Sequence, residues 1–285
     1  MSAPEPAAYS AQPVQPLLLV IDSSARKADG ESVRIAKDVL CAGSAGLGPV
    51  KICLPDGPEE FARALARRGA RRPVVVGDDR ALVRAVAALH RERELASSVL
   101  SLVPVGASTA LAAALGVPAG AVAAARAVLD GAPHRLDLLV DDSDGVVLGQ
   151  LVIPVPVTAA APPAESGSLL RTAQSLVRTL VRPAPVRAAA PGPARLRVEA
   201  DGVMLVDLDQ PVDGVSVAPA RGGVARVEVR SSSAVSPVRA EAHRITISGP
   251  DFRYRADAVT SGPVRTRTWT VRAGAWALTL PSASA

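Results

Sequence analysis

Four short apolar runs alternate with segments of helical periodicity in the first half of the chain, and this alternation limits the fold more than any other feature. Parallel strands that are covered on both faces read as continuous apolar runs, and each crossover between them needs room for a helix. The runs are LLLVI (17–21), VKICL (50–54), PVVVG (73–77) and VLSLVPV (99–105). The sequence therefore predicts a doubly wound parallel α/β sheet.

The segments between these runs have the features of α-helices. The segment 30–43 repeats apolar residues on one face and ends in glycine. The segment 57–69 opens with proline and two glutamates and ends with arginines, an order that suits the helix dipole. We predict a third helix over 79–96 and two short alanine-rich helices within 107–130.

The pattern changes near residue 135. The segment RLDLLVDDSDGVVLGQLVIPV (135–155) reads as a β-hairpin that turns at Asp144-Gly145. A Pro/Ala-rich stretch over 154–167 and a predicted helix over 168–183 follow. From 195 to 281 the apolar residues repeat with a period of two between regularly spaced turns, which favours an all-β sandwich.

These patterns divide the chain. We expect a disordered leader over 1–16, an α/β nucleotide-binding-like domain over 17–131 and a β-rich C-terminal domain over 132–285. The helix 168–183 is an insertion in the second domain, and the last strands are expected to return towards the first.

Composition narrows the class of partner. The net charge of +5 permits attraction to nucleic acid or to an anionic membrane. No basic run is interleaved with aromatic residues, so we expect no nucleic-acid binding. The two cysteines, Cys41 and Cys53, do not form a CxxC pair and suggest neither a redox motif nor a zinc site.

The sequence predicts a cytosolic protein. The first residues lack the basic start and apolar stretch of a signal peptide, and no apolar run has the length of a membrane-spanning helix. In the helix predicted over 168–183, Arg171, Arg178 and Arg182 share one face. Such a helix can attach a protein to the periphery of an anionic membrane, but the same pattern suits a helix packed on a sheet, which we favour.

Three loops follow the apolar runs at the end of the sheet where α/β proteins bind ligands. They contain Asp22-Ser23-Ser24, Gly77-Asp78-Asp79 and Gly106-Ala107-Ser108-Thr109. Backbone amides at helix N-termini can hold phosphate, and an aspartate can hold Mg²⁺. The same residue types are the favoured helix N-caps, so each loop taken singly is more often a cap. Their placement on one sheet edge favours a nucleotide cleft.

A second group of acids lies in the predicted hairpin. Asp137, Asp141, Asp142 and Asp144 fall within eight positions of one another. Carboxylates at such a density can bind a metal, but a turn with solvated acids explains them more simply. We favour the turn.

Two motifs at the predicted loops resemble the diacylglycerol kinase catalytic family, which includes sphingosine kinases and is distantly similar to NAD kinases. The family's Gly-Gly-Asp-Gly-Thr corresponds to Val76-Gly77-Asp78-Asp79-Arg80. Its second motif corresponds to PVGASTALAAALG (104–116), and its Asp-Gly-Glu to Asp257-Ala258-Val259. The resemblance implies an α/β domain followed by a β-rich domain, with the active site in the cleft between them.

The resemblance also implies a function. A lipid kinase of this family transfers phosphate from ATP·Mg²⁺ to a diacylglycerol-like hydroxyl. Asp78 would then be the catalytic, metal-supporting residue. The nucleotide would lie against the residues of the three loops, namely Asp22, Ser23, Gly77, Asp78, Asp79, Gly106, Ser108 and Thr109.

Several family residues are replaced in this chain. Val76 stands in place of a glycine, where we expect a β-branched side chain in the path of the phosphates, and Val259 stands in place of a glutamate. Phosphoryl transfer depends on positioning and charge neutralisation, so each loss lowers the expected rate. The alternative is a catalytically silent relative that binds nucleotide or lipid as a sensor or partner-binding protein.

Overall fold

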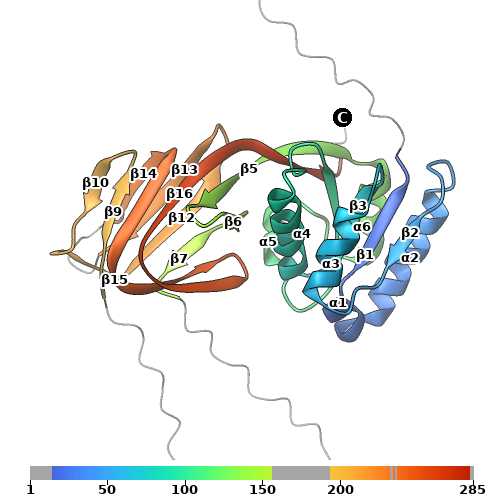
Figure 1. The fold of residues 1–285 in the computed structure, drawn as a ribbon, viewed down its shortest axis with the longest axis horizontal. Helices are drawn as coiled ribbons and strands as arrows, with labels where there is room; N and C mark the ends of the chain where they lie inside the picture. The colour runs from blue at the N-terminus through green and yellow to red at the C-terminus, as the bar shows by residue number, and fades with distance from the viewer. Residues whose placement is uncertain (1–14, 156–192, 232–233, 235, 283–285) are drawn as a thin grey trace, which may run out of the picture.

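A computed structural model describes residues 15–155, 193–231, 234 and 236–282. The helix predicted over 168–183 and nearly all of the predicted leader lie outside these residues. The described chain forms two lobes, an α/β lobe and a β lobe, which lie side by side in Figure 1.

The α/β lobe has the parallel sheet that the sequence predicts. Its strands are adjacent in the order β2-β1-β3-β4, all parallel. The strands are β1 (Leu17–Ile21), β2 (Lys51–Cys53), β3 (Arg72–Gly77) and β4 (Val99–Pro104). The helices are α1 (Ser23–Ala28), α2 (Gly30–Gly43), α3 (Pro58–Ala66), α4 (Asp79–Arg91), α5 (Ala110–Ala114) and α6 (Ala121–Asp130).

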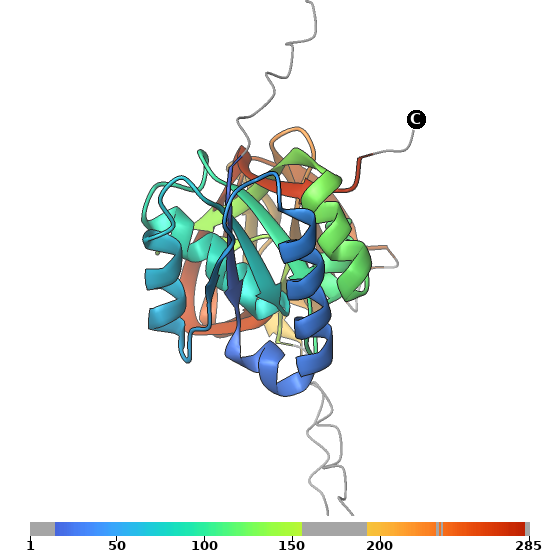
Figure 2. The same ribbon diagram turned by 90° about the vertical axis from the view of Figure 1, so that its right-hand side faces the viewer.

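Helices cover both faces of this sheet (Figure 2). Because successive strand residues point to opposite faces, Leu17, Leu19 and Ile21 pack in one core with residues of α2 and α6. Leu18 and Val20 pack in a second core with residues of α3 and α4. The fold is therefore doubly wound, which confirms the predicted fold class.

Helix α4 ends earlier than the predicted 79–96 because the backbone reverses after Arg91. Arg93 has a φ of +58°, in the left-handed region that closes many helices. The backbone N–H of Glu94 donates to the carbonyl of Leu89 at 2.9 Å, which satisfies one of the last helical acceptors. The apolar pattern alone continues through Leu95, so it overestimates the helix.

The β lobe is built from antiparallel strands around its own core. The predicted hairpin is present as β5 (Ala132–Asp141) paired with β6 (Val146–Val147), with Asp144-Gly145 in the turn. The remaining strands are β7 (Leu151–Ile153), β8 (Ala194–Arg195), β9 (Arg197–Ala200), β10 (Val203–Val206), β11 (Pro211–Val212), β12 (Gly214–Ala220), β13 (Val224–Arg230), β14 (Val238–Ala242), β15 (Arg244–Ala256) and β16 (Val259–Leu280).

Strand β16 joins the two lobes. It has 22 residues, enough to span about 70 Å when extended. Its first half pairs with β15, its second half pairs with β5, and Ala277 and Leu278 lie parallel to β4. Figure 1 shows β16 as an arch from one lobe to the other. A buried hydrogen bond of 2.8 Å from the Ser101 hydroxyl to Thr279 supports the contact with β4.

A bulge bends β16 between the two lobes. The register of β16 against β5 shifts between Arg272 and Trp276, and Gly274 within this segment has a φ of +53°. The carboxylate of Asp137 accepts hydrogen bonds from the backbone N–H of Gly274 at 2.6 Å and of Gly223 at 2.9 Å. Asp137 therefore ties the bulge to the turn between β12 and β13.

The chain's two tryptophans lie on either side of this bulge. Trp269 is in the core of the β lobe and Trp276 is in the core that α3 and α4 cover, and both are 0% exposed. The ring of Tyr254 meets that of Trp269 edge-on at 5.2 Å between centroids. One strand thus contributes a large side chain to each lobe.

In the part of the chain that the structure describes, no helix has the length and apolar character needed to cross a membrane.

We expect the two lobes to unfold together because β16 contributes to both cores. Trp269→Phe and Trp276→Phe each leave a single tryptophan that reports on one lobe. For each variant, the urea midpoint measured by tryptophan fluorescence should equal the midpoint measured by circular dichroism, which reports on both lobes. If the fluorescence midpoint of either variant differs from its circular dichroism midpoint, the lobes unfold separately.

Candidate functional site

The structure brings the three predicted loops together at one edge of the α/β sheet. The backbone N–H of Asp22 donates to the carbonyl of Val76 at 2.9 Å, and that of Val105 donates to Gly77 at 3.0 Å. The N–H of Asp79 donates to the carbonyl of Ser108 at 2.9 Å. The loops after β1, β3 and β4 are therefore hydrogen-bonded neighbours.

Asp22 caps a helix and neutralises an arginine. Its carboxylate accepts hydrogen bonds from the backbone N–H of Ser24 at 2.9 Å and from the Ser24 hydroxyl. It also forms an ion pair with Arg84 of α4. Burial acts to raise the pKa of Asp22, but the bonds from Ser24 and the charge of Arg84 outweigh it, so the pKa lies below its ordinary value. Ser23 is the first residue of α1.

Asp78 caps helix α4. One of its carboxylate oxygens accepts a hydrogen bond from the backbone N–H of Ala81 at 3.1 Å. Within the described residues its other carboxylate oxygen has no hydrogen-bond partner. Asp78 thus has a structural role and one free acceptor, and its predicted role in metal binding and catalysis stays a prediction.

The two glycines of the predicted loops have packing reasons for being glycine. A Cβ atom on Gly77 would lie 2.5 Å from the Cβ of Ala81 and 3.2 Å from that of Asp22. Gly106 has a φ of +133°, and a Cβ there would lie 3.0 Å from the Cβ of Asp78. Close contacts between the loops therefore require these glycines, whether or not a phosphate approaches them.

Asp79 connects two helices. It is the first residue of α4 and is 3% exposed. Its carboxylate accepts hydrogen bonds from the Ser108 hydroxyl at 2.8 Å and from the backbone N–H groups of Leu111 at 3.1 Å and Ala112 at 3.0 Å. Asp79 therefore caps α5, and Thr109, the residue at the N-cap position of α5, makes no side-chain cap of its own.

A cleft of about 680 Å³ opens beside Asp79 between the lobes. Of the eight predicted site residues, Asp79 and Ser108 line it, together with residues of both lobes. The α/β lobe also contributes Arg80, Ala110, Leu111 and Ala114, and the β lobe contributes Gly149, Gln150, Arg255, Asp257, Ala258 and Thr260. The other predicted residues lie in the same loops but do not line the cleft.

The cleft contains two arginines that are free to bind an anion. Arg80 comes from the first turn of α4 and Arg255 from β15. Neither guanidinium has a hydrogen bond or ion pair to another residue within the described parts of the chain. The cleft thus offers one cationic side chain from each lobe.

Asp257 is a second acid of the cleft, and the sequence reasoning missed it. Its carboxylate accepts hydrogen bonds from the backbone N–H groups of Leu148 at 2.7 Å, Gly149 at 2.8 Å and Gln150 at 2.9 Å. Burial raises the pKa of Asp257 above its ordinary value, and the negative charge of Asp79 adds to this effect. Asp257 matches the aspartate of the family's Asp-Gly-Glu, which was the signal that could have identified it.

The expectation that Val76 obstructs the phosphates is wrong. Its side chain is 0% exposed and packs in the core with residues of α2 and α6. Because β3 is covered on both faces, the side chains of its residues point into one core or the other and not towards the loops. The replacement of glycine by valine here affects packing.

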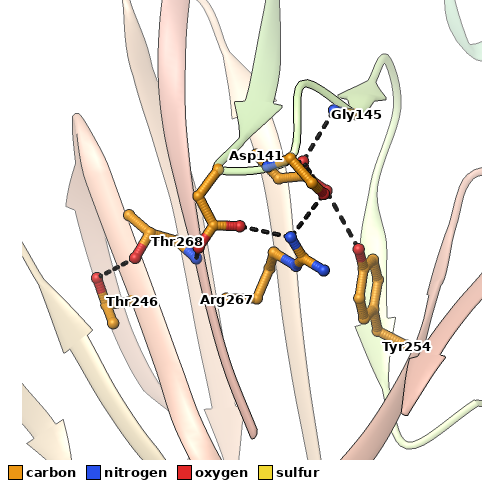
Figure 3. A network of polar contacts seen from close by, with 8 residues as sticks. Asp141, Gly145, Thr246, Tyr254, Arg267 and Thr268 are labelled. Carbon is orange, nitrogen blue, oxygen red and sulfur yellow. Dashed lines mark hydrogen bonds and ion pairs between the residues drawn. The ribbon is translucent and has the colours of Figure 1, made fainter. Parts of the chain in front are cut away.

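The acids of the β5–β6 hairpin are engaged in polar contacts of the β lobe (Figure 3). The carboxylate of Asp141 accepts hydrogen bonds from the backbone N–H groups of Ser143 and Gly145, both at 2.8 Å, and from the Tyr254 hydroxyl at 3.2 Å. Asp142 forms an ion pair with Arg267 at 2.6 Å. Within the described residues, no group of three or more His, Cys, Asp or Glu side chains could hold a metal ion.

Asp22→Asn should lower the free energy of unfolding by about 1–3 kcal/mol at pH 7, because it removes a charge-assisted contact to Arg84 and keeps the capping carbonyl. Since the pKa of Asp22 is lowered in the folded protein, the stability from its charge is fully present above the ordinary aspartate pKa of about 3.9. It is lost as the pH falls through the lowered value.

Urea unfolding at pH 7 and at pH values below 4 tests this prediction. The difference between the wild type and Asp22→Asn should shrink as the pH falls. A difference of the same size at every pH would mean that the charge of Asp22 contributes nothing to stability.

Comparisons with known proteins support the fold. No family model matches the chain, and a search of curated proteins finds no matching relative. Solved structures do match. A candidate diacylglycerol kinase from Bacillus anthracis str. Sterne aligns with a TM-score of 0.70 at 13% identity, covering 93% of this chain and 97% of that one.

Two further structures from Bacillus anthracis str. Sterne agree with the first. One is also described as a candidate diacylglycerol kinase and has a TM-score of 0.68 at 13% identity, covering 95% of this chain and 98% of that one. The other is described as a diacylglycerol kinase and has a TM-score of 0.66 at 12% identity, covering 94% and 98%. The chain therefore has, over nearly its whole length, the two-lobed fold of these diacylglycerol kinase structures.

Proposed function

We propose that this protein binds a nucleotide in the cleft between its lobes and transfers the nucleotide's phosphate poorly or not at all. The observation that carries the proposal is the contrast between the charged groups of the cleft. Its arginines, Arg80 and Arg255, are free to bind an anion, whereas its acids, Asp79 and Asp257, are held by the protein's own backbone.

The shape and charge of the cleft support binding. Its volume of about 680 Å³ lies within the range of about 300–1,000 Å³ that is usual for small-molecule sites. Arginines form strong, geometrically specific hydrogen bonds with phosphates. A polyphosphate between Arg80 and Arg255 would contact both lobes, and Leu111 and Ala114 offer an apolar surface beside it.

The state of the acids argues against efficient transfer. Asp79 and Asp257 each accept three hydrogen bonds from protein donors. A carboxylate whose acceptor positions are occupied in this way is a poorer metal ligand, because it must give up hydrogen bonds within the protein before it can coordinate a metal ion. The described residues of the cleft therefore fit a nucleotide better than a resident magnesium ion.

Binding of ATP should depend on both arginines. Arg80→Ala and Arg255→Ala should each weaken ATP binding about tenfold or more, because each removes a charge-assisted contact. Arg253→Ala is a matched control, since Arg253 is an exposed arginine of the same strand that does not line the cleft. Isothermal titration calorimetry measures the affinities.

Two results would contradict the proposal. In the first, the wild-type protein shows no heat of ATP binding with or without Mg²⁺. In the second, Arg253→Ala weakens binding as much as Arg255→Ala does, which would show that only the overall charge matters.

A lipid kinase is the second candidate function. It is favoured by the fold and by the raised pKa of Asp257, which brings this acid closer to the pH at which it could exchange a proton with a substrate hydroxyl. In such a reaction the hydroxyl oxygen of a diacylglycerol bonds to the γ-phosphorus, ADP leaves, and the hydroxyl proton passes to Asp257.

Transfer of labelled phosphate from ATP to short-chain diacylglycerol separates the two candidates. We expect no transfer above that of a protein-free control containing Mg²⁺. If the wild type transfers phosphate, and Asp257→Asn abolishes the transfer without changing the affinity for ATP, the protein is a lipid kinase. That result would refute our proposal of binding without efficient transfer.

A further inference from the structure

A second cavity lies between the lobes, separate from the cleft. Its volume is about 560 Å³. Its walls come from the end of α5, from the first half of β5, and from the turn between β12 and β13. Ala114 lines both cavities, so α5 separates the two.

Three basic side chains line this second cavity: His134 and Arg135 of β5, and Arg221 of the β12–β13 turn. Arg221 is exposed and has no hydrogen bond or ion pair to any other described residue. One terminal nitrogen of Arg135 donates to the backbone carbonyl of Ala96 at 2.9 Å and contacts that of Gly274 at 3.5 Å, and the other guanidinium nitrogens have no partner among the described residues. The β12–β13 turn therefore contributes an unpaired cation to a cavity that two basic residues of β5 also line.

The cavity's one acid, Asp137, offsets only part of this charge, because two arginines line the same cavity. Both carboxylate oxygens of Asp137 accept hydrogen bonds from backbone N–H groups, one from Gly274 at 2.6 Å and the other from Gly223 at 2.9 Å. Asp137 is thus engaged in holding the β16 bulge and the β12–β13 turn. The basic groups have no other acidic side chain among the lining residues.

A cavity with these properties suits a small anion. The remaining lining residues, Ala114, Leu115, Leu136, Leu148, Pro219, Ala220, Gly222 and Leu280, have no charged side chain and few polar atoms. Removing a phosphate group from water is costly unless several donors replace its hydration. Two arginines and a histidine provide such donors in a space large enough for a phosphate and a small group attached to it.

We infer that this cavity is a second ligand site, which binds a phosphomonoester through Arg221, Arg135 and His134. The ligand contacts both lobes at once, since Arg221 belongs to the β lobe and α5 to the α/β lobe. The site is independent of the cleft because it shares no charged residue with it.

The phosphomonoester can come from two sources, which separate probes distinguish. Inorganic phosphate and glycerol 3-phosphate test a free ligand by isothermal titration calorimetry. Vesicles of phosphatidylcholine with and without phosphatidic acid test a lipid headgroup by co-sedimentation. Each probe is applied to the whole protein and to the same variants.

Arg221→Ala is the test variant, and Arg226→Ala is its matched control. Both are exposed arginines of one hairpin without side-chain partners in the described structure, so neither change should affect folding, and thermal unfolding checks this. Arg226 does not line the cavity. Arg80→Ala serves as the control for the cleft.

We expect at least one of the probes to bind the wild type, with Arg221→Ala weakening that binding about tenfold and Arg226→Ala and Arg80→Ala leaving it within about twofold. If Arg221→Ala weakens the binding of glycerol 3-phosphate, the ligand is a free phosphomonoester. If it weakens only the binding of vesicles that contain phosphatidic acid, the ligand is a lipid headgroup. Binding that all three variants weaken equally, or no binding of any probe, overturns the inference. Failure of ATP to bind at the cleft would leave this result unaffected.

Discussion

The pairing of β16 with β5 holds this molecule together. These two strands run from one core to the other, and the bulge that Asp137 fixes lets them change direction on the way. Trp269 and Trp276 anchor the same strand in the two cores. The relative position of the lobes depends on this arrangement, and so do the cleft and the second cavity that lie between them.

The aspartates in the loops after β1 and β3, and Asp257 of the cleft, serve mainly to hold loops in place. Asp22, Asp78 and Asp79 cap α1, α4 and α5 respectively, and Asp257 binds three backbone N–H groups next to β7. The chain shares its fold with structures described as diacylglycerol kinases. In this chain, however, the acids hold helices and loops in place, while Arg80 and Arg255 of the cleft have no partner among the described residues. This division of roles leads to our proposal of binding without efficient transfer.

The sequence predicts the larger features well because burial is periodic. The continuous apolar runs identify β1, β3 and β4, and the period of two identifies the β lobe. Proximity of the three loops follows from the parallel sheet alone. Contacts between distant segments cannot be predicted in this way. Asp79 caps a helix that begins about thirty residues later, and no local sequence pattern indicates that hydrogen bond.

The errors have similar causes. The motif alone predicts that Val76 faces the phosphates, whereas the burial of β3 on both faces turns its side chain into the core. The motif loses its glutamate at Val259, which predicts a weakened site, and the same motif keeps its aspartate at Asp257, which the structure places in the cleft. The sequence does not predict the cavity beside Arg221, because its walls come from segments that are far apart in the chain. They are α5, β5 and the β12–β13 turn, which meet only when the two lobes pack together.

The stability of Asp79→Ala shows whether the acids of the cleft serve the fold. If Asp79 is a cap, its removal leaves two N–H groups of α5 unsatisfied, and urea unfolding at pH 7 should show a loss of about 1–3 kcal/mol. Replacing a catalytic residue has the opposite effect in many enzymes and raises the free energy of unfolding, because active-site residues are often selected for activity at a cost in stability. A variant as stable as the wild type, or more stable, would contradict the account.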